Sequence, residues 1–140
     1  MISFFYETNF TLPHEEADFE RWISLAIASE RKQVGDINYI FCNDDYLYKI
    51  NVEYLNHDTL TDIITFDYTK GTLLSSDIYI SVERVADNAK DFGVDFETEL
   101  LRVMVHGVLH LCGYKDKTEA ESQKMRQKEE EKMQLFTFKK

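Results

Sequence analysis

The chain has 140 residues, of which 44% are apolar, so intrinsic disorder is excluded and one domain with a single core is expected over residues 1–140. The formal net charge of −10 argues against broad binding of a nucleic-acid backbone, which needs a basic face. No apolar run reaches the ~20 residues of a membrane span, and no signal-peptide pattern is present, so we expect a cytoplasmic protein.

Strand and helix patterns are mixed along the chain without regular alternation. Gly35 and Asp36 are expected to separate the first helix from the next strand, and Gly71 lies in a connection short enough for an antiparallel hairpin. The predicted elements are, in chain order, a strand over 1–7, a helix over 15–32, a strand over 37–42, a helix over 44–54, strands over 61–68 and 76–82, and helices over 83–92, 96–112 and 118–135. This order predicts an α+β fold, in which a mixed sheet of about four strands packs against helices.

The helix predicted over residues 96–112 is apolar on most of its faces, and Arg102 is its only charge between Leu100 and Leu111. Such a helix is buried rather than lying at the surface. The segment that follows is rich in glutamate and lysine, which predicts a polar surface helix, with a capping box formed by Thr118 and Glu121 at its start.

Two histidines on the buried helix form the clearest candidate site. His106 and His110 are four residues apart, so their side chains lie on one face of the helix, one turn apart. Gly113 can end the helix in a left-handed conformation and turn the chain back, which brings Asp116 within reach of the same ion. This is the layout of the metzincin motif with aspartate in the third place. Three protein ligands leave a fourth position for water, which predicts a catalytic zinc site.

The same residues also admit simpler interpretations. A histidine pair at this spacing occurs by chance as well, and Asp116 could belong to a solvated turn between two lysines. The remaining histidines, His14 and His57, lie in predicted loops and are expected at the surface. Gly107 occupies the position that supplies the general base in His-Glu-x-x-His peptidases, so a protease is not favoured.

The cysteines and the basic residues indicate no second site. Cys42 and Cys112 form no disulfide framework, and Cys112 lies off the face that carries the histidines, so a buried free thiol is expected there. The segment after the histidines carries basic residues interleaved with glutamates, which predicts a solvated helix face: Lys115, Lys117, Lys124, Arg126 and Lys128.

The run from His106 to Tyr114, His-Gly-Val-Leu-His-Leu-Cys-Gly-Tyr, resembles the hallmark of the YbeY proteins, zinc-dependent endoribonucleases of bacterial ribosomal RNA maturation. Three upstream segments are similar to blocks of that family in order and spacing: Asn51–Tyr54, Thr61–Phe66 and Ser76–Arg84. The resemblance covers nearly the whole chain. It implies an endoribonuclease of ribosomal RNA processing and ribosome biogenesis, whose metal-bound water attacks an RNA phosphodiester, and one zinc ion on His106, His110 and Asp116.

The resemblance further implies a ribosomal RNA precursor as substrate and the ribosome or ribosomal proteins as partners, whereas no general base can be named. Asp116 stands where the family has its usual third histidine, and Leu55 stands where it has an arginine. Aspartate is an accepted zinc ligand. An arginine near the metal could clamp a phosphate, so Arg102, Arg84 or a nearby lysine would have to replace it.

Two strand carboxylates are further candidates. The resemblance places Asp62 and Asp77 near the site, where each could accept a hydrogen bond from a metal-ligating imidazole or could be an ordinary polar strand residue. The alternative function is a ribosome-assembly factor that binds RNA or ribosomal protein and uses its metal mainly for structure, which the acidic charge favours. A third candidate is a hydrolase of another small or peptide substrate.

Overall fold

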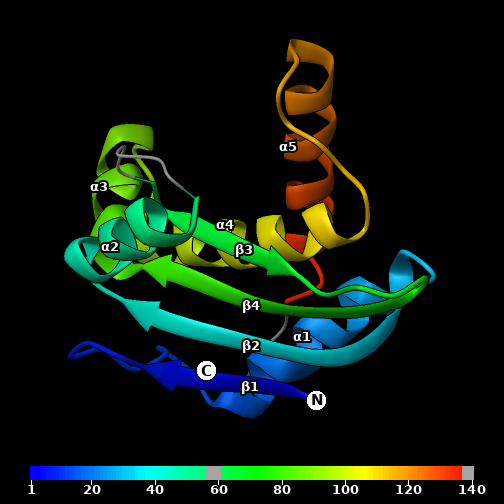
Figure 1. Cartoon of the computed structure of the whole chain (residues 1–140). Coiled ribbons are helices and arrows are strands. Elements are labelled where there is room, and N and C mark those ends of the chain that lie inside the picture. Colours follow the sequence, from blue (N-terminus) through cyan, green and yellow to red (C-terminus); the bar gives the residue numbers. More distant parts are fainter. Residues whose placement is uncertain (56–60, 137–140) are drawn as a thin grey trace.

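The computed structural model describes residues 1–55 and 61–136, which form four strands and five helices. In chain order these are β1 (Ile2–Tyr6), α1 (Glu16–Ser29), β2 (Gln33–Cys42), α2 (Asp44–Leu55), β3 (Ile63–Asp67), β4 (Leu73–Ser81), α3 (Val82–Phe92), α4 (Phe96–Leu111) and α5 (Glu119–Met133) (Figure 1). The predicted α+β class is confirmed. The loop histidine His57 lies outside the described residues.

The four strands form one mixed sheet in the order β1-β2-β4-β3. β1 and β4 both run parallel to β2, with Ile2 opposite Ile37 at one side and Ile78 opposite Tyr39 at the other. β3 pairs antiparallel with β4, so the predicted hairpin around Gly71 is confirmed. The sheet is parallel where helices connect its strands and antiparallel where a short turn does, as chain connectivity requires.

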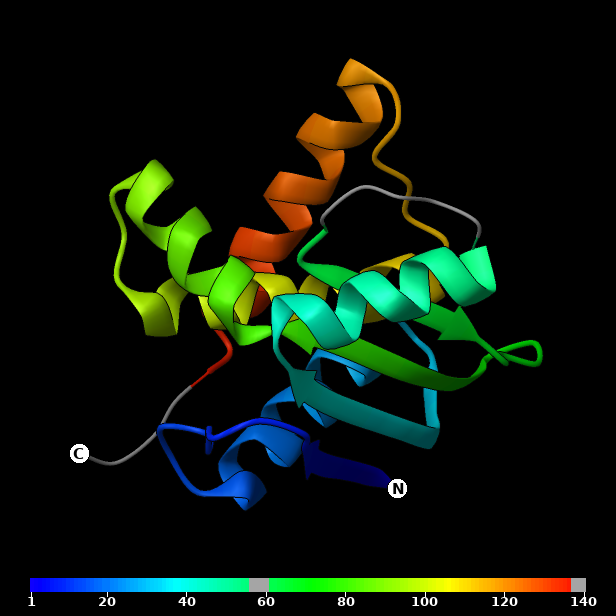
Figure 2. The same ribbon diagram turned by 60° about the vertical axis from the view of Figure 1, so that its left-hand side comes forward.

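The two faces of the sheet are covered by different helices. Alternate residues of β2 and β4, among them Tyr39 and Ile78, enter a large core shared with α1 and α4. The hydroxyl of Tyr39 donates to the carbonyl oxygen of Met104 at 2.8 Å, which ties β2 to α4. On the opposite face, Ile64 packs with Leu47 of α2 in a smaller cluster. Figure 2 shows α2 on one side of the sheet and α1 and α4 on the other.

Three boundaries differ from the prediction by three residues or more, one of them the start of β4, which lies at Leu73 instead of residue 76. The first helix ends at Ser29, before a turn in which Arg31 adopts a φ of 60°, rather than continuing to residue 32. The next strand begins at Gln33 and runs through Gly35 and Asp36, instead of starting after them, with a bulge after Val34. A Cβ at Gly35 would collide with Ser75 Oγ and lie 2.7 Å from Leu74 O, so glycine here permits close strand approach rather than a break.

α4 is buried as predicted, and Gly107 allows it to lie close to the sheet. A Cβ at Gly107 would lie 3.0 Å from Ile63 Cδ1 and 3.3 Å from Ile78 Cγ2. The residue that follows the first histidine is therefore a packing contact between helix and strands. Any side chain at this position would require Ile63 and Ile78 to shift, so the position that supplies the peptidase base serves here in helix–sheet packing.

α5 packs against α4 and rises from the rest of the molecule (Figure 1). Its predicted capping box is present: Thr118 Oγ1 accepts from Glu121 N at 3.1 Å, and Glu121 Oε1 accepts from Thr118 N at 3.0 Å. Most of the helix is exposed as expected, but Met125, Glu129 and Lys132 are buried on one face. In the described part of the chain, no helix is both long and apolar enough to cross a membrane.

Candidate metal centre

The two histidines of α4 meet at their ring nitrogens. His106 and His110 lie one turn apart, with ring centroids 4.5 Å apart and the rings nearly perpendicular. Their Nε2 atoms are 2.9 Å apart. Both side chains are half-buried, because the rest of α4 is packed against the sheet and only this edge of the helix reaches solvent.

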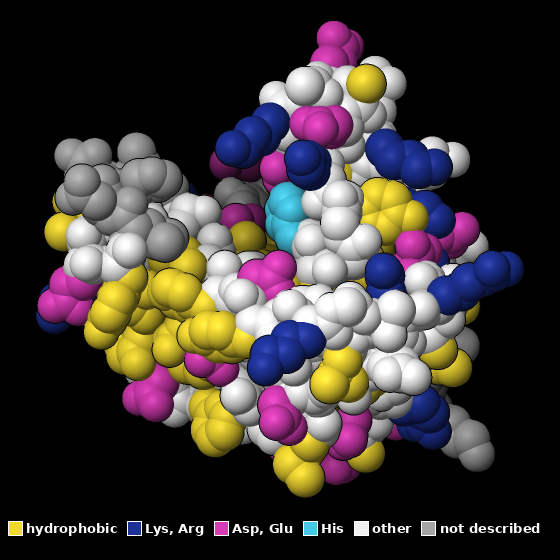
Figure 3. All heavy atoms as spheres, turned by 45° about the vertical axis from the view of Figure 1, so that its right-hand side comes forward, with side chains coloured by type: hydrophobic (Ala, Val, Ile, Leu, Met, Phe, Trp, Pro, Cys, Tyr) yellow, Lys and Arg dark blue, Asp and Glu magenta, His cyan; other side chains and the backbone are white. Residues whose placement is uncertain are grey.

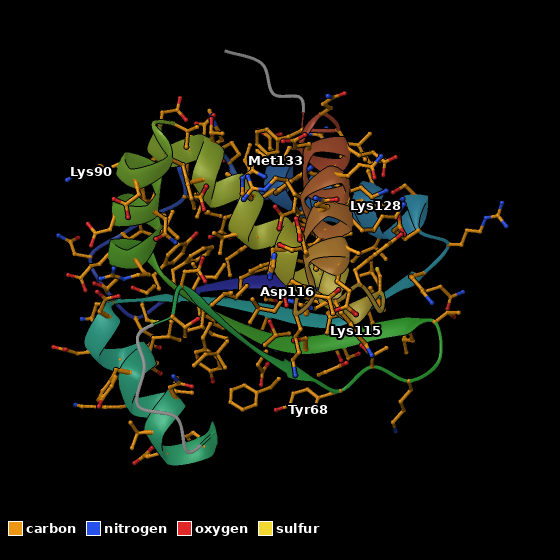
Figure 4. All side chains as sticks on the ribbon, turned by 90° about the horizontal axis from the view of Figure 1, so that it is seen from above. Tyr68, Lys90, Lys115, Asp116, Lys128 and Met133 are labelled. Carbon is orange, nitrogen blue, oxygen red and sulfur yellow. The ribbon has the colours of Figure 1, made fainter. Side chains whose placement is uncertain are left out.

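A glycine turn after α4 brings in the third residue. Gly113 has a φ of +105°, Tyr114 N donates to Leu109 O at 3.1 Å, and Gly113 N donates to His110 O at 3.0 Å, which together form a Schellman cap. The chain then turns so that Asp116 Oδ2 lies 3.3 Å from His106 Nε2 and 3.4 Å from His110 Nε2. Figure 4 shows Asp116 near the crossing of α4, α5 and the sheet.

The other ring nitrogen of each histidine is already used. His110 Nδ1 lies 2.9 Å from Tyr114 O, and because a carbonyl only accepts, this nitrogen carries the proton. His106 Nδ1 lies 2.6 Å from Glu129 Oε2 and donates to that carboxylate. In neutral imidazoles both Nε2 atoms then present lone pairs toward each other and toward Asp116, an arrangement that a cation stabilises.

The donor set fits a tetrahedral divalent ion. Zinc bonds of 2.0–2.2 Å at tetrahedral angles separate neighbouring ligand atoms by roughly 3.3–3.5 Å, and the three separations here are 2.9, 3.3 and 3.4 Å. Across residues 1–55 and 61–136, this is the one group of histidine, cysteine and carboxylate side chains with its ligand atoms this close together. Three ligands on one side leave the remaining position open toward solvent.

Glu129 of α5 is a site residue that the sequence analysis did not identify. Glu129 Oε1 accepts from Arg102 Nη1 at 3.0 Å, so the Glu129 carboxylate is held by His106 on one oxygen and by Arg102 on the other. Arg102 Nε also lies 3.6 Å from Glu99 Oε1. Burial of the His106 ring lowers its pKa, but the hydrogen bond with Glu129 and the negative charges of Glu129, Asp116 and Asp62 together outweigh burial and place that pKa above its ordinary value. A carboxylate that orients a ligand histidine in this way is typical of metal sites.

Of the two candidate strand carboxylates, Asp62 lies near the histidines and Asp77 does not. Asp62 lies beside His106 and is bonded by Asn88 Nδ2 at 3.2 Å, and burial raises the pKa of its carboxyl. Neither histidine donates to it. Asp77 lies on the opposite face of the sheet, where Asn38 Nδ2 donates to its Oδ1 at 3.0 Å. The placement of Asp77 near the site is therefore wrong, because the side chains next to it in β4 face the core.

Leu55 stands where the resembled family has an arginine, and Arg102 and Arg84 are the two arginines expected to take over its role. Only Arg102 lies at the site. Arg84 is paired with Asp44 at 2.9 Å and Asp87 at 3.3 Å, away from the histidines. Arg102 lies between two glutamates, and its side chain is 16% exposed. Residue 55 is the last residue of α2.

The remaining described histidine and the two cysteines can also be compared with what the sequence predicts. His14 lies in a loop as predicted but is half-buried, with Nε2 2.7 Å from Glu97 Oε1 and its ring against Phe19. Both cysteines are free, as expected. Cys112 is half-buried rather than buried, and burial raises the pKa of its thiol to about 11.

Two pockets meet at the candidate ligands, and both are lined by Asp62, Ile63, His106 and Asp116. The helical pocket, of about 260 Å3, lies between α3, α4 and α5 and includes Arg102 and Arg126. The strand pocket, of about 490 Å3, runs along β3 and includes Asn51 and His110. Figure 3 shows histidine reaching the surface in a hollow, with basic side chains nearby. The cluster thus lies at the junction of one continuous depression.

Several known proteins are similar to this chain in sequence or structure. A protein-family model described as "Endoribonuclease YbeY" matches residues 5–137. The endoribonuclease YbeY of Flavobacterium johnsoniae is 64% identical over 136 residues, covering 97% of both chains, and that of Flavobacterium psychrophilum is 59% identical over 139 residues, covering 99% of both. The solution structure of TM1509 from Thermotoga maritima has a TM-score of 0.66 at 26% identity, covering 97% of this chain and 89% of that chain.

Proposed function

The chain belongs to the endoribonuclease YbeY family, and we propose that it is a metal-dependent hydrolase of RNA phosphodiesters, with one zinc ion held by His106, His110 and Asp116. The proposal includes a precursor of ribosomal RNA as substrate, a role in ribosome biogenesis in contact with ribosomal components, and a cytoplasmic location, where such precursors are made.

The convergence of three ligand atoms supports this proposal most directly. Both histidines direct Nε2 toward Asp116, and in a neutral ring this nitrogen carries the lone pair because Nδ1 is bonded elsewhere. When bound there, a zinc ion polarises a phosphoryl oxygen and activates water for attack on the phosphodiester. The open side of the cluster faces the junction of two pockets, so an extended substrate can pass across it.

Groups around the cluster orient the two histidine rings for metal binding. Glu129 fixes the ring of His106 and keeps the proton on Nδ1, and Arg102 holds Glu129 in place. The Tyr114 carbonyl does the same for His110. These groups act through the ligands, so they are positioning residues rather than catalytic ones.

The test is cleavage of a fluorescent single-stranded RNA by zinc-loaded, chelated and zinc-restored protein. We expect cleavage to disappear on chelation, to return with zinc, and to be absent in His110→Ala. His14→Ala is the matched control, since it removes a half-buried histidine that contacts Glu97 and Phe19 rather than the cluster, and it should cleave like the wild type. Equal cleavage by the wild type and His110→Ala would contradict the proposal.

One observation favours the second candidate, a ribosome-assembly factor with a structural metal. Among the described residues that line the strand pocket there is no lysine or arginine, while Asp62, Asp67 and Asp116 contribute carboxylates. Such a surface suits a basic protein partner better than a phosphate backbone. Binding of chelated protein to purified ribosomal subunits, together with no RNA cleavage by the zinc-loaded protein, would favour this function over the nuclease.

A further inference from the structure

Among the described residues that line the two pockets, lysine and arginine occur in only one pocket. The strand pocket has no lysine or arginine among its described residues, and α2 contributes Asn51 to it. The helical pocket is lined by two arginines, Arg102 and Arg126. Guanidinium groups that could bind a phosphate adjacent to the scissile one therefore come from α4 and α5.

The two arginines of the helical pocket differ in what they already contact. Arg102 is largely buried and shared between Glu99 and Glu129, so its charge is compensated within the protein. Arg126 is exposed, and none of the ion pairs among residues 1–55 and 61–136 includes it. Its guanidinium can exchange water for a phosphate without breaking an existing salt bridge.

An exposed aromatic ring lies next to that guanidinium. Phe92 is 57% exposed, and Arg126 Cζ lies 6.0 Å from the centre of its ring, within the range of a cation–π contact. Phe92 is the last residue of α3, and Gly93 ends the helix there with a φ of 67°, its N–H bonded to Lys90 O. The ring is thus held at the rim of the pocket by a defined helix end.

Polar and acidic groups complete the lining of the helical pocket. Ser122 lies one turn before Arg126 on α5, and both line the same wall. Deep in the pocket, Glu129 is paired with Arg102 at 3.0 Å, and Asp62 accepts a hydrogen bond from Asn88. Glu99 Oε1 is buried 3.6 Å from Arg102 Nε without a hydrogen-bond partner among the described residues. Among the described lining residues, the basic charge that remains open to a ligand is that of Arg126.

We propose that the helical pocket is a nucleotide subsite for single-stranded RNA, in which Arg126 binds the phosphate next to the scissile one and Phe92 stacks on the adjoining base. The assignment rests on the proposed nuclease function for its orientation relative to the metal. Aromatic rings stack on any base, and guanidinium groups bind any phosphate, so the subsite selects unpaired RNA rather than a sequence. A duplex cannot offer an unstacked base to Phe92.

The test is the kinetics of single-stranded RNA cleavage by Arg126→Gln and Phe92→Ala, with the salt dependence of each. Arg126→Gln should raise KM by roughly five- to tenfold with kcat nearly unchanged, and should reduce the slope of log(kcat/KM) against log salt by about 0.7. Phe92→Ala should raise KM by about tenfold and leave that slope unchanged, while Phe92→Trp should restore KM. Arg21→Gln on α1 and Phe5→Ala on β1 alter exposed residues away from the pocket and should leave both quantities unchanged.

Binding of the same RNA to chelated protein, followed by fluorescence anisotropy, separates this inference from the proposed function. Weaker binding by Arg126→Gln and Phe92→Ala, with normal binding by the two controls, supports the subsite even if the wild type cleaves nothing, in which case only the nuclease proposal fails. Wild-type cleavage together with wild-type KM and binding in both variants overturns the subsite. An equal effect of the two control substitutions overturns it as well.

Discussion

Whether the histidine pair can hold an ion depends on both nitrogens of each ring. The Nε2 atoms face the cluster, and the hydrogen bonds of the Nδ1 atoms determine which nitrogen carries the proton. His106 Nδ1 is bonded to Glu129, and His110 Nδ1 is bonded to a main-chain carbonyl. These contacts fix which nitrogen carries the proton in each ring. The geometry of the site therefore extends to α5, far from the motif in the sequence.

Substitution of Glu129 tests this second layer of contacts. Glu129→Gln should lower zinc affinity by about 10- to 100-fold, because the amide accepts a weaker hydrogen bond and no longer stabilises the ligand imidazole. Competition with a chromophoric chelator measures the affinity. Glu130→Gln, at the adjacent exposed position, is the matched control, and the same loss in both variants would rule out a specific role for Glu129.

Substitution of Gly113 tests the turn that presents Asp116. Gly113→Ala should cost about 1–2 kcal/mol of stability, since a φ of +105° disfavours any side chain, and should also weaken zinc binding. Gly71→Ala is the control, because Gly71 has a φ of 59° in the β3–β4 turn, away from the cluster. Thermal unfolding should show destabilisation in both variants and chelator competition a zinc defect only in Gly113→Ala; zinc defects of equal size would contradict the assigned role of the turn.

Among the elements, α5 depends on α1 for its position as well as on α4. Trp22 Nε1 donates to Lys132 O at 2.7 Å, and Glu30 accepts from Lys132 and Lys128 of α5 and from Tyr114. This network lies at the end of α5 that is remote from its capping box. It holds the helix that carries Glu129 against the rest of the molecule.

The network predicts a specific dependence of stability on pH. Burial alone would raise the pKa of Glu30, but hydrogen bonds from Lys132, Tyr114 and Lys128 outweigh burial and lower it from 4.5 to about 2. Because the folded-state pKa is depressed, the stabilisation is complete above pH 4.5 and is lost as the pH falls through 2. It corresponds to about 3 kcal/mol at neutral pH.

Urea unfolding between pH 2 and 7 measures this contribution. The difference in free energy of unfolding between the wild type and Glu30→Gln should be constant from pH 7 to about 5 and should shrink below about pH 4.5. Glu20→Gln, at an exposed position of α1, should show no such difference. A wild-type advantage that grows toward low pH would contradict the assigned direction of the Glu30 pKa.

The elements also show which features the sequence could predict. α4, its histidine pair and the Gly113 turn follow from spacing within one short segment, and all are predicted from it. Glu129 is not, because its role depends on where α5 crosses α4; the spacing of Met125, Glu129 and Lys132 along one face is the available indication. The alternation of β4 could have placed Asp77 on the face opposite Ile78. The start of β2 depends on a contact between Gly35 and a different strand, which local sequence does not reveal.

At the scale of the whole molecule, the ligands form a local cluster on a fold that is built without them. His106, His110 and Asp116 lie within one segment of the chain, while the main core joins α1 and α4 to the sheet. Removal of zinc should therefore leave a folded protein with one cooperative unfolding transition and a lower melting temperature, because the ion stabilises only by mass action. Circular dichroism of chelated protein checks this, and an unfolded spectrum at room temperature would show that the metal is structural.

The net charge of −10 limits where an RNA chain can approach the protein. A strongly acidic protein repels phosphates over most of its surface, so association should depend on the few basic groups near the site. The helical pocket carries Arg102 and Arg126, and the strand pocket has no basic residue among those described. The asymmetry of these two pockets, rather than total charge, reconciles the composition with a nucleic-acid substrate.

Anomalous scattering at the zinc edge, measured on crystals grown with zinc, tests the central assignment most directly. We predict one strong peak bonded to Nε2 of His106, Nε2 of His110 and one carboxylate oxygen of Asp116, at about 2.0–2.2 Å from each. A peak at another position, or one bonded to the histidines while both oxygens of Asp116 lie out of reach, would contradict it.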